Sequence, residues 1–495
     1  MSTKTREAGS PNLKDAGLLR QAAYVGGWWT GADSGQTVSV TNPATSARLG
    51  AVPDMGAAET GRAIAAAEDA LPSWRATLAK DRGRLLRDWF DLIIENQDDL
   101  AAILTAEQGK PLLEARAEVV SGAAFIEWFA EEARRTYGQV IPAPAPDRRV
   151  VVIKQPIGVC AAITPWNFPN TIITRKAGAA LAAGCTMVIR PDSRTPFSAL
   201  ALAELASRAG IPPGVLNVIT GDAAEIGLEL TSNPIVRKLS FTGSTRVGSK
   251  LMAQSASTVT KLTLELGGNA PFIIFDDADL EAAVDGAVAS KFRNVGQACV
   301  GANRFYVQSG VFEEFEKELV QRVSQLRVGN GVDDGVSVGP LIDATAVEKV
   351  QGHIDDAIAK GARLVAGGKR HELGGSFFQP TIVSEVTSDS LIAAQETFGP
   401  VAALFRFETE AELVSASNAT EYGLAAYLYS RDIGRIWRMA EAIEVGMVGV
   451  NVGLMANEAV PFGGIKQSGI GREGAREGIE EYLELKYICM GGISA

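Results

Sequence analysis

Short apolar, β-branched runs alternate with longer amphipathic runs along much of this chain. From position 150 the strand-like runs are VVVIKQ, GVCAAIT, CTMVIRP, VLNVIT, KLSFTG and KLTLEL, and helical stretches such as TRKAGAALAAG separate them. Thr195 and Pro196 supply an N-cap and a first helical position for the run PFSALALAELASRAG. Such alternation is typical of a doubly wound, mainly parallel α/β sheet.

A second series of alternating runs begins at PFIIFDD. It continues through RFYVQ, the charged helical run VFEEFEKELVQRVSQLRVG and GMVGVN. We therefore expect a second α/β domain, with the boundary near the pair Gly267–Gly268. The length of 495 residues agrees with this division, because a single hydrophobic core rarely extends so far.

Two strand-like segments belong to neither series. Residues Val140 to Ile153 contain two runs separated by prolines, which predicts a hairpin leaving the first domain, and the tail ELKYICM alternates like a terminal strand. One interpretation is that these segments pair across subunits. The other is that both are edge strands within one chain, and the pattern alone favours neither.

Composition narrows the class of protein. Hydrophobic residues make up 46% and charged residues 21%, which is typical of a globular chain with ample core. A net charge of −11 argues against a nucleic-acid partner. The N-terminal residues lack the apolar core of a signal peptide, and the longest mostly apolar run, Ala177 to Ile189, is too short to span a bilayer. We expect a cytoplasmic protein with no membrane partner.

Cysteine and histidine are scarce. The four cysteines include no C-x-x-C pair, which fits a reducing compartment. The only histidines are His353 and His371, and we expect both at the surface. Two histidines leave few ways to build a Ser-His-Asp triad, a Cys-His dyad or a histidine metal site, and we expect no metal.

One cysteine differs from the others. Cys160 and Cys185 lie in apolar strand-like runs and Cys489 lies in the tail, where inert thiols are the rule. Cys299 lies in FRNVGQACVGANR, among small and polar residues that suit the lining of a site. An ordinary thiol is mostly protonated at neutral pH and needs a base, here a carboxylate. The residues alone leave open whether Cys299 is a nucleophile.

Glu265 is the leading carboxylate. It is the only acid in the apolar run KLTLEL, and a buried carboxylate with a raised pKa suits a general base. The alternative is a solvent-facing strand residue.

Among the glycine motifs, 469–474 matches G-x-G-x-x-G but follows no apolar strand, so we do not expect a dinucleotide fingerprint there. The run FTGSTRVG follows a strand and opens a helix, where a phosphate could bind.

Seven ordered strings resemble the aldehyde dehydrogenase superfamily over nearly the whole chain: PWNFP, RPDSRTPFSALA, FTGSTRVG, LELGGNAP, GQACV, ETFGP and PFGGIKQSG. Within the superfamily, NFPNTIITRKAGAALAAGC and SKFRNVGQACVGANR look most like succinate-semialdehyde dehydrogenases. The resemblance implies an aldehyde dehydrogenase-like α/β fold of two doubly wound domains and a small β extension, and a homodimer or homotetramer. The implied divisions are a cofactor-binding domain at 1–136 and 157–266, a catalytic domain at 267–468, and an oligomerisation extension at 137–156 and 469–495.

The resemblance also implies roles in catalysis. Cys299 would attack the aldehyde to form a thiohemiacetal and then a thioester, which Glu265 would hydrolyse by deprotonating water. The Asn167 side chain and the Cys299 backbone N–H would hold the oxyanion. Lys176 and Glu396 would bind the cofactor ribose, and Lys176 would also relay protons. Relatives that transfer the acyl group to coenzyme A typically lack the glutamate found here, which favours hydrolysis.

A larger set of positions is implied to bind the cofactor. Ser193 stands where many relatives have a glutamate that would repel a 2′-phosphate, and Arg190 and Arg194 flank it, so we expect NADP ahead of NAD. The implied cofactor-binding residues are Thr164, Pro165, Trp166, Lys176, Arg190, Ser193, Phe241, Thr242, Gly243, Ser244, Gly248, Leu266, Glu396 and Phe398.

The implied substrate is succinic semialdehyde. Arg175 and Arg293 would clamp its carboxylate, although from spacing alone both could be structural ion-pair residues. Ala456 stands where relatives have a serine that helps hold the carboxylate, and Gly301 where many have a second cysteine. Glutarate semialdehyde, another short ω-carboxylated aldehyde, or a general aldehyde is the alternative.

Overall fold

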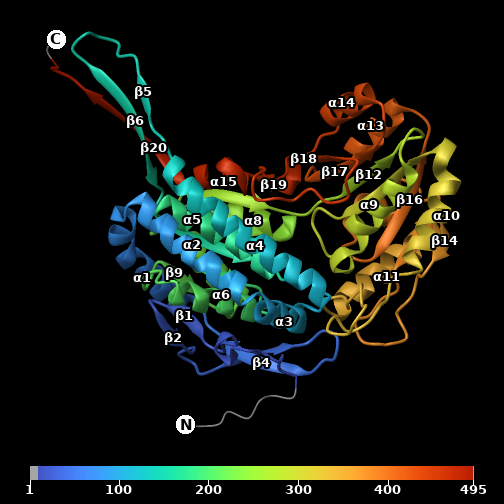
Figure 1. The fold of residues 1–495 in the computed structure, drawn as a ribbon, viewed down its shortest axis with the longest axis horizontal. Helices are drawn as coiled ribbons and strands as arrows, with labels where there is room; N and C mark the ends of the chain where they lie inside the picture. Colours follow the sequence, from blue (N-terminus) through green and yellow to red (C-terminus); the bar gives the residue numbers. More distant parts are fainter. Residues whose placement is uncertain (1–8, 494–495) are drawn as a thin grey trace.

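The computed structural model describes residues 9–493. Two large sheets lie side by side, each with helices packed against it, and a narrow three-stranded sheet projects from the body (Figure 1). A short two-stranded ribbon, β3 (Thr37–Thr41) and β4 (Arg48–Pro53), lies near the N-terminus. The five short 3-10 segments are η1 (Ala16–Leu18), η2 (Ala133–Arg135), η3 (Arg293–Gly296), η4 (Ser309–Val311) and η5 (Lys466–Ser468).

The first sheet has the order β19-β11-β10-β7-β8-β9-β1-β2. Its neighbours from β11 to β9 all pair in parallel, as the alternating pattern predicted, and only the outer strands are antiparallel. Its strands are β1 (Ala23–Val25), β2 (Trp28–Thr30), β7 (Val159–Thr164), β8 (Thr186–Pro191), β9 (Leu216–Val218), β10 (Val236–Thr242), β11 (Lys261–Glu265) and β19 (Gly469–Ile470).

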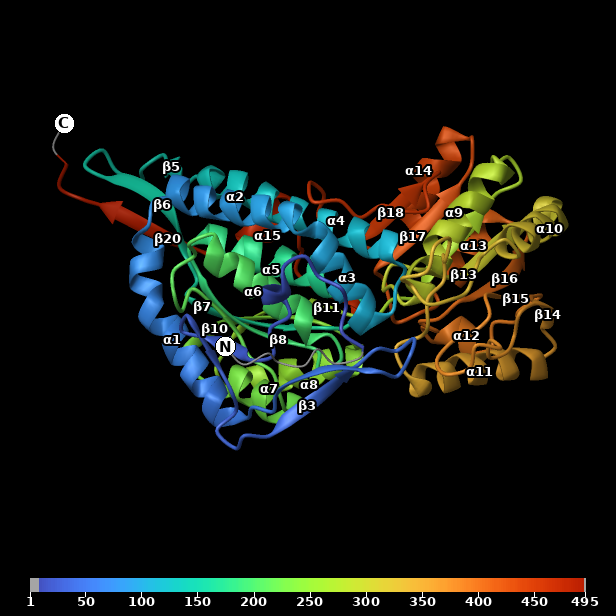
Figure 2. The same cartoon turned by 60° about the horizontal axis from the view of Figure 1, so that its bottom comes forward.

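Helices cover both faces of this sheet (Figure 2). The predicted start of α6 is confirmed, with Thr195 at the N-cap and Pro196 in the first helical position. On one side lie α1 (Ala57–Ala76), α7 (Ala223–Ser232) and α8 (Thr245–Ser255), and on the other α2 (Ala79–Glu95), α3 (Gln97–Gln108), α4 (Leu112–Glu132), α5 (Pro169–Ala183) and α6 (Pro196–Arg208).

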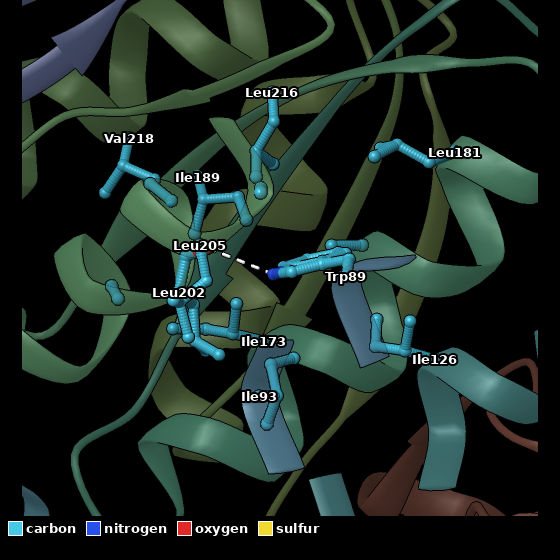
Figure 3. Packing of buried hydrophobic residues seen from close by; sticks show 14 of the residues in the cluster. Trp89, Ile93, Ile126, Ile173, Leu181, Ile189, Leu202, Leu205, Leu216 and Val218 are labelled. Atoms are coloured by element: carbon cyan, nitrogen blue, oxygen red, sulfur yellow. Dashed lines mark hydrogen bonds between the residues drawn. The ribbon is translucent and has the colours of Figure 1, made fainter. Parts of the chain in front are cut away.

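The largest core lies between the sheet and the second helical layer (Figure 3). Trp89 of α2 is fully buried there, and its indole N–H donates to the carbonyl oxygen of Leu202 at 3.1 Å. Leu181 of α5 and Ile189 of β8 belong to the same cluster, so sheet and helices share one continuous apolar layer. Such packing makes the carboxyl edge of the sheet a rigid base for a site.

The second sheet has the order β14-β15-β16-β13-β12-β17-β18 and is parallel except for β14. The charged helix predicted from residue 311 is present but ends at Val323, before its expected end. The strands are β12 (Ala270–Ile274), β13 (Ala302–Gln308), β14 (Arg363–Ala366), β15 (Thr381–Ser384), β16 (Val401–Phe407), β17 (Ala425–Tyr429) and β18 (Met447–Val450). The helices are α9 (Leu280–Phe292), α10 (Phe312–Val323), α11 (Ala344–Ala359), α12 (Leu391–Ala394), α13 (Glu410–Asn418) and α14 (Ile433–Ala442).

The projecting sheet joins the two segments that belonged to neither series. Strand β6 (Arg149–Pro156) pairs antiparallel with β5 (Gln139–Ile141) on one side and with β20 (Leu483–Met490) on the other. The hairpin and the tail therefore find partners within one chain. Residues 469–482, which the sequence assigned to the extension, lie instead with the first sheet, because β19 pairs with β11 and α15 (Ala475–Glu480) packs against α4 and α5.

The expected surface position of His353 is wrong. His353 lies on the inner face of α11, where only 4% of the residue is exposed, and its Nδ1 lies 3.1 Å from the hydroxyl oxygen of Thr397. Burial lowers its pKa to about 4, so it is neutral. His371 lies partly exposed in a loop. Across residues 9–493, no helix has the length and apolar character needed to cross a membrane.

Candidate active site

A cleft of about 320 Å³ lies between the two sheets. One wall consists of the segments that follow β7, β10 and β11, which is where open α/β sheets bind ligands. The other wall consists of the start of α11 and the segment 396–398. The lining residues are Pro165, Trp166, Asn167, Arg194, Thr242, Gly243, Ser244, Leu266, Gly267, Cys299, Ile342, Asp343, Thr345, Ala346, Lys349, Glu396, Thr397 and Phe398.

The strand–turn–helix at β10 and α8 has the predicted form. Ser244 caps α8, accepting a hydrogen bond from the Val247 N–H, so the helix N-terminus opens beside the cleft. A Cβ on Gly243 would lie 2.4 Å from the Phe241 ring, and one on Gly248 would lie 2.5 Å from Leu266. Phe241 and Gly248 are not among the residues that line the cleft. Their contacts shape the turn at Gly243 and Ser244, which does line it.

Several buried polar atoms along this wall lack a partner in the described residues. They are the hydroxyls of Thr164 and Thr242 and the Nε of Arg190, all at the carboxyl ends of parallel strands. Buried polar groups normally have hydrogen-bond partners, so these atoms mark a place where a polar ligand would supply them. A dinucleotide cofactor, with its phosphates at the N-terminus of α8, fits this arrangement.

The opposite wall carries Glu396, Phe398 and Lys349. The Gly268 N–H donates to Glu396 at 3.3 Å; burial raises the pKa of this carboxyl to about 7, and the nearby Lys349 opposes the rise. Phe398 has a left-handed backbone, with φ of 56°, and its ring meets Trp166 edge-on at 5.6 Å. Lys349 escaped the sequence reasoning, because a lysine on an amphipathic helix looks like an ordinary surface residue.

The loop after β8 departs from its expected form. Arg194 bonds to Asp192 through two contacts of 2.9 and 3.0 Å and reaches across the cleft to Asp343 at 2.9 Å. Its charge is therefore already compensated, and only Arg190, whose guanidinium donates to the Gly221 carbonyl at 3.2 Å, has no ion-pair partner in the described chain. Neither Arg190 nor Ser193 lines the cleft directly.

Cys299 lines the cleft at the end of a strained turn. Asn294 and Val295 both adopt left-handed backbone angles near 50°, and Cys299 follows them, partly exposed. Burial, with the negative charge of Glu396, raises the pKa of its thiol to about 12, so it needs a base. Cys160 and Cys185 are buried as expected, and Cys489 is exposed.

Asn167 faces the same cleft from the loop after β7. Its Nδ2 donates to the Gln297 carbonyl at 3.0 Å, which leaves its second amide hydrogen free. Two groups donate hydrogen bonds to its backbone carbonyl oxygen: Lys110 Nζ at 2.7 Å and Asn294 Nδ2 at 2.9 Å. The sequence reasoning did not single out Lys110 or Asn294 for a role.

Glu265 ends β11 and is buried, so the solvent-facing alternative is wrong. Both of its carboxylate oxygens lack a partner in the described residues. Burial and the nearby charge of Glu473 raise its pKa well above the ordinary value. Gly463 has φ of 154°, and a Cβ there would lie 2.8 Å from one of these oxygens and 2.8 Å from the Gly471 carbonyl oxygen, so glycine is required.

A model of the aldehyde dehydrogenase family matches residues 29–488. The chain belongs to the aldehyde dehydrogenase family. The resemblance seen in the motifs and the expected α/β fold are thereby confirmed, and the protein is an oxidoreductase of a family that uses NAD(P).

Three relatives cover almost the whole of this aldehyde dehydrogenase. It is 63% identical to glutarate-semialdehyde dehydrogenase of Pseudomonas aeruginosa, over 97% of this chain and 100% of that one. It is 61% identical to succinate-semialdehyde dehydrogenase (NADP(+)) of Escherichia coli and 60% identical to 3-sulfolactaldehyde dehydrogenase of Pseudomonas putida, each over 97% of this chain and 99% of the relative. The crystal structure of an E. coli NADP-dependent enzyme matches with a TM-score of 0.97 and 61% identity, over 97% of this chain and 100% of that one.

A buried ionic cluster lies behind the site of this aldehyde dehydrogenase. Lys176, fully buried, donates to Ser240 at 2.9 Å and pairs with Glu473, and Arg175 lies 2.6 Å from the same carboxylate. Lys176 therefore does not lie on the cleft wall expected for a ribose ligand. Glu473 stands inside the string 469–474 that we discounted; the adjacent cations Arg175 and Lys176, both unsuited to lone burial, were the signal that a buried acid was needed.

The two expected clamp arginines differ. The Arg175 side chain is 5% exposed and pairs with Glu473, a carboxylate that it shares with Lys176, so the structural ion-pair alternative applies to it. Arg293 forms no ion pair within residues 9–493, and its Nε has no hydrogen-bond partner there. Its guanidinium lies 5.3 Å from the centre of the Phe168 ring, the residue next to Asn167. Of these two arginines, Arg293 is the one without an ion pair in the described residues, and the acid that its charge affects is Glu114.

Proposed function

We propose that this enzyme oxidises a short aldehyde carrying a terminal anionic group, with succinic semialdehyde as first candidate and glutarate semialdehyde as second. Arg293, six residues before Cys299, carries the proposal: it is half-buried, and its buried Nε has no hydrogen-bond partner in the described residues, which favours an anionic ligand. The names of the relatives support both candidates, and 3-sulfolactaldehyde carries an anion as well.

We assign the first half of the reaction to Cys299 and Asn167. The Cys299 sulfur, after passing its proton to the ionised carboxylate of Glu265, attacks the aldehyde carbon and forms a thiohemiacetal. The free amide hydrogen of Asn167 and the Cys299 backbone N–H stabilise the oxygen as it becomes negative. A nicotinamide cofactor, when held in the cleft, would accept the hydride, and the substrate carbon is left as a thioester on Cys299.

The second half is hydrolysis, which we assign to Glu265. Its carboxylate, once ionised, removes a proton from water, and the hydroxide releases the acid from Cys299. Two unpartnered oxygens leave the group free to bind that water. Lys176 and Glu473 lie behind Glu265, where the pair can take the proton onward.

For the cofactor we propose NADP ahead of NAD. Gly243 and Ser244 would face the pyrophosphate, Glu396 and Phe398 the nicotinamide riboside, and Trp166 would line the cleft between them. Ser193 stands where many relatives have a glutamate, so no carboxylate at that position would repel a 2′-phosphate. Arg190 supplies a cation nearby. Arg194 contributes less than the sequence implied, since Asp192 and Asp343 neutralise it.

We also propose a homodimer or homotetramer. The projecting sheet exposes large apolar side chains on its outer strands, among them Val140, Leu485 and Tyr487. A surface of this kind is typical of an interface. Light scattering of the purified protein measures the assembly, and a monomer would contradict this part of the proposal.

The test of substrate class is a matched aldehyde panel. Succinic semialdehyde and butanal share a four-carbon chain, and glutarate semialdehyde and pentanal share five carbons, so each pair differs only in charge. We expect kcat/KM to favour the acid of each pair strongly, and NADP over NAD. If butanal equals succinic semialdehyde, the enzyme is a general aldehyde dehydrogenase. The better of the two acids identifies the chain length that the site prefers.

A further inference from the structure

A buried ion pair, Lys110–Glu118, lies behind the loop that carries Asn167. The side chains are only 1% and 2% exposed, and no sequence motif pointed to them. Lys110 lies in the turn between α3 and α4, which Gly109 permits with φ of 96°. A Cβ on Gly109 would lie 2.8 Å from Pro340, so this turn packs tightly against the other domain.

The Lys110–Glu118 pair forms hydrogen bonds with the backbone at both ends of the segment 167–171. Lys110 Nζ donates to the Asn167 carbonyl at 2.7 Å and lies 4.0 Å from the centre of the Phe168 ring. Glu118 accepts the Asn170 N–H at 2.9 Å and the Thr171 N–H at 3.4 Å, in the first turn of α5. The backbone from 167 to 171 is therefore fixed by one cation and one anion.

A second carboxylate on the same helix holds the nucleophile loop. Glu114, one turn before Glu118 in α4, accepts the Asn294 N–H at 2.7 Å. The Asn294 side chain in turn donates to the Asn167 carbonyl at 2.9 Å. Helix α4 thus holds both the loop that bears Asn167 and the turn that leads to Cys299.

Stability alone does not account for such a pair. Burying an ammonium and a carboxylate carries a large desolvation penalty, and a well-packed apolar pair is often as stable or more so. What an apolar pair cannot do is hold a carbonyl oxygen and two N–H groups at fixed points. A displacement of about 1 Å in a reacting geometry lowers a rate by up to about a hundredfold.

We propose that Lys110 and Glu118 are positioning residues, which fix the Asn167 loop so that its amide meets the oxyanion formed on attack by Cys299. Neither residue touches the substrate; Lys110 acts through the Asn167 carbonyl, and Glu118 acts through Lys110 and the first turn of α5. The inference rests on the proposed roles of Asn167 and Cys299.

The test compares three variants of the pair with two reference variants. Lys110→Met leaves Glu118 buried without its cation, and Glu118→Gln leaves Lys110 without its anion. Lys110→Met/Glu118→Gln leaves no charge at either position, while the amide oxygen can still accept the Asn170 N–H. Asn167→Ala removes the proposed oxyanion donor. Lys154→Met breaks the partly buried pair between Lys154 of β6 and Glu480 of α15, neither of which lines the cleft, and is the control.

Three quantities are measured: the thermal unfolding midpoint, the single-turnover rate of reduced-cofactor formation at saturating aldehyde, and the alkylation rate of Cys299 by iodoacetamide. We expect each single variant to unfold at lower temperature and the double variant to return close to the parent. The single-turnover rate of the double variant stays at least about tenfold low, with KM little changed. Alkylation stays near the parent rate, because the thiol itself is untouched.

Each outcome separates the possibilities. If the double variant recovers both stability and single-turnover rate, the pair is only structural and the positioning proposal is wrong. A fall in alkylation by the same factor as the rate would show that the whole site has collapsed, and would also overturn it. If Asn167→Ala keeps the parent rate, the oxyanion role within the proposed function fails instead.

Discussion

The two sides of the catalytic cleft are built in opposite ways. On the carboxyl edge of the first sheet, buried polar atoms of Thr164, Thr242 and Glu265 have no partner in the described residues. On the α3–α4 side, the charged groups of Lys110 and Glu118 are bonded, and each also holds a backbone group of the Asn167 loop. An unbonded buried polar atom is unfavourable, so its persistence marks a place where a ligand or a proton completes it.

The difference separates reacting groups from the groups that hold them. Changes on the carboxyl edge should lower activity with little loss of stability, because those side chains hold nothing else in place. Changes on the α3–α4 side should lower both. Enzymes commonly trade stability for reactivity at such unbonded groups.

Removing the thiol should give the largest effect. Cys299→Ala should abolish formation of reduced cofactor, since no hydride leaves without the covalent adduct. The unfolding midpoint should stay within about 1 °C of the parent, since a small, partly exposed side chain is lost. Absorbance at 340 nm and a thermal melt measure the two quantities, and steady turnover in this variant would refute the covalent mechanism.

Glu265→Gln should follow in size. Turnover should fall by about a hundredfold or more, because the amide cannot take the proton from water. The unfolding free energy should stay level or rise, because an unbonded buried carboxyl is replaced by a neutral group of the same shape. Steady-state kinetics and urea unfolding measure the pair of effects. A loss of stability equal to that of Lys110→Met would erase the contrast between the two sides.

The two arginines near the site should behave unequally. Arg293→Gln should raise KM for succinic semialdehyde by about tenfold or more and leave butanal unaffected, since one charged hydrogen-bond pair is lost. Arg175→Gln should instead destabilise the fold by about 3 kcal/mol, at the low end for a broken buried pair, because Lys176 still faces Glu473. Kinetics with both substrates and urea unfolding decide between them. Equal KM effects from both arginines would restore the two-residue clamp.

Glu473→Gln should shift the pH dependence of hydrolysis. The negative charge of Glu473 raises the pKa of Glu265, so its removal lowers that pKa. Arg175 and Lys176, left uncompensated, push the pKa of Glu265 in the same direction. The rise of the deacylation rate with pH should therefore begin at lower pH than in the parent. A profile of deacylation rate from pH 6 to 10 tests this, and a shift to higher pH would contradict it.

The smallest effect should come from Asp192→Asn. It removes one partner of Arg194, so that guanidinium can turn to a 2′-phosphate, and the NADP-to-NAD ratio of kcat/KM should rise by about two- to fivefold. Ser193→Glu, which adds the repelling carboxylate, should move the ratio the other way. A parent enzyme that prefers NAD would remove the proposed cofactor preference itself.

The sequence by itself determined many of the elements and the candidates for the reacting residues. Strand–turn–helix runs such as FTGSTRVG fix local structure through the spacing of apolar residues and a capping serine, and β10 and α8 formed as predicted. Cys299 and Glu265 stood out as candidates because of their neighbours in sequence, whereas Asn167 was named only through the family resemblance. Each of these signals is local, because it depends only on residues within a few positions of the one that it marks.

Only the tertiary structure decided which charges are paired. Lys110 contacts Asn167, 57 positions away, and Lys176 contacts Glu473, 297 positions away. Nothing in the neighbouring sequence therefore distinguishes Arg175, which pairs with Glu473, from Arg293, which has no ion pair in the described residues. His353 looked polar in sequence yet lies on the buried face of α11. Burial and pairing depend on which distant elements pack together. They decide which pKa values are shifted and which buried polar atoms stay without a hydrogen-bond partner, and the proposed reaction depends on both.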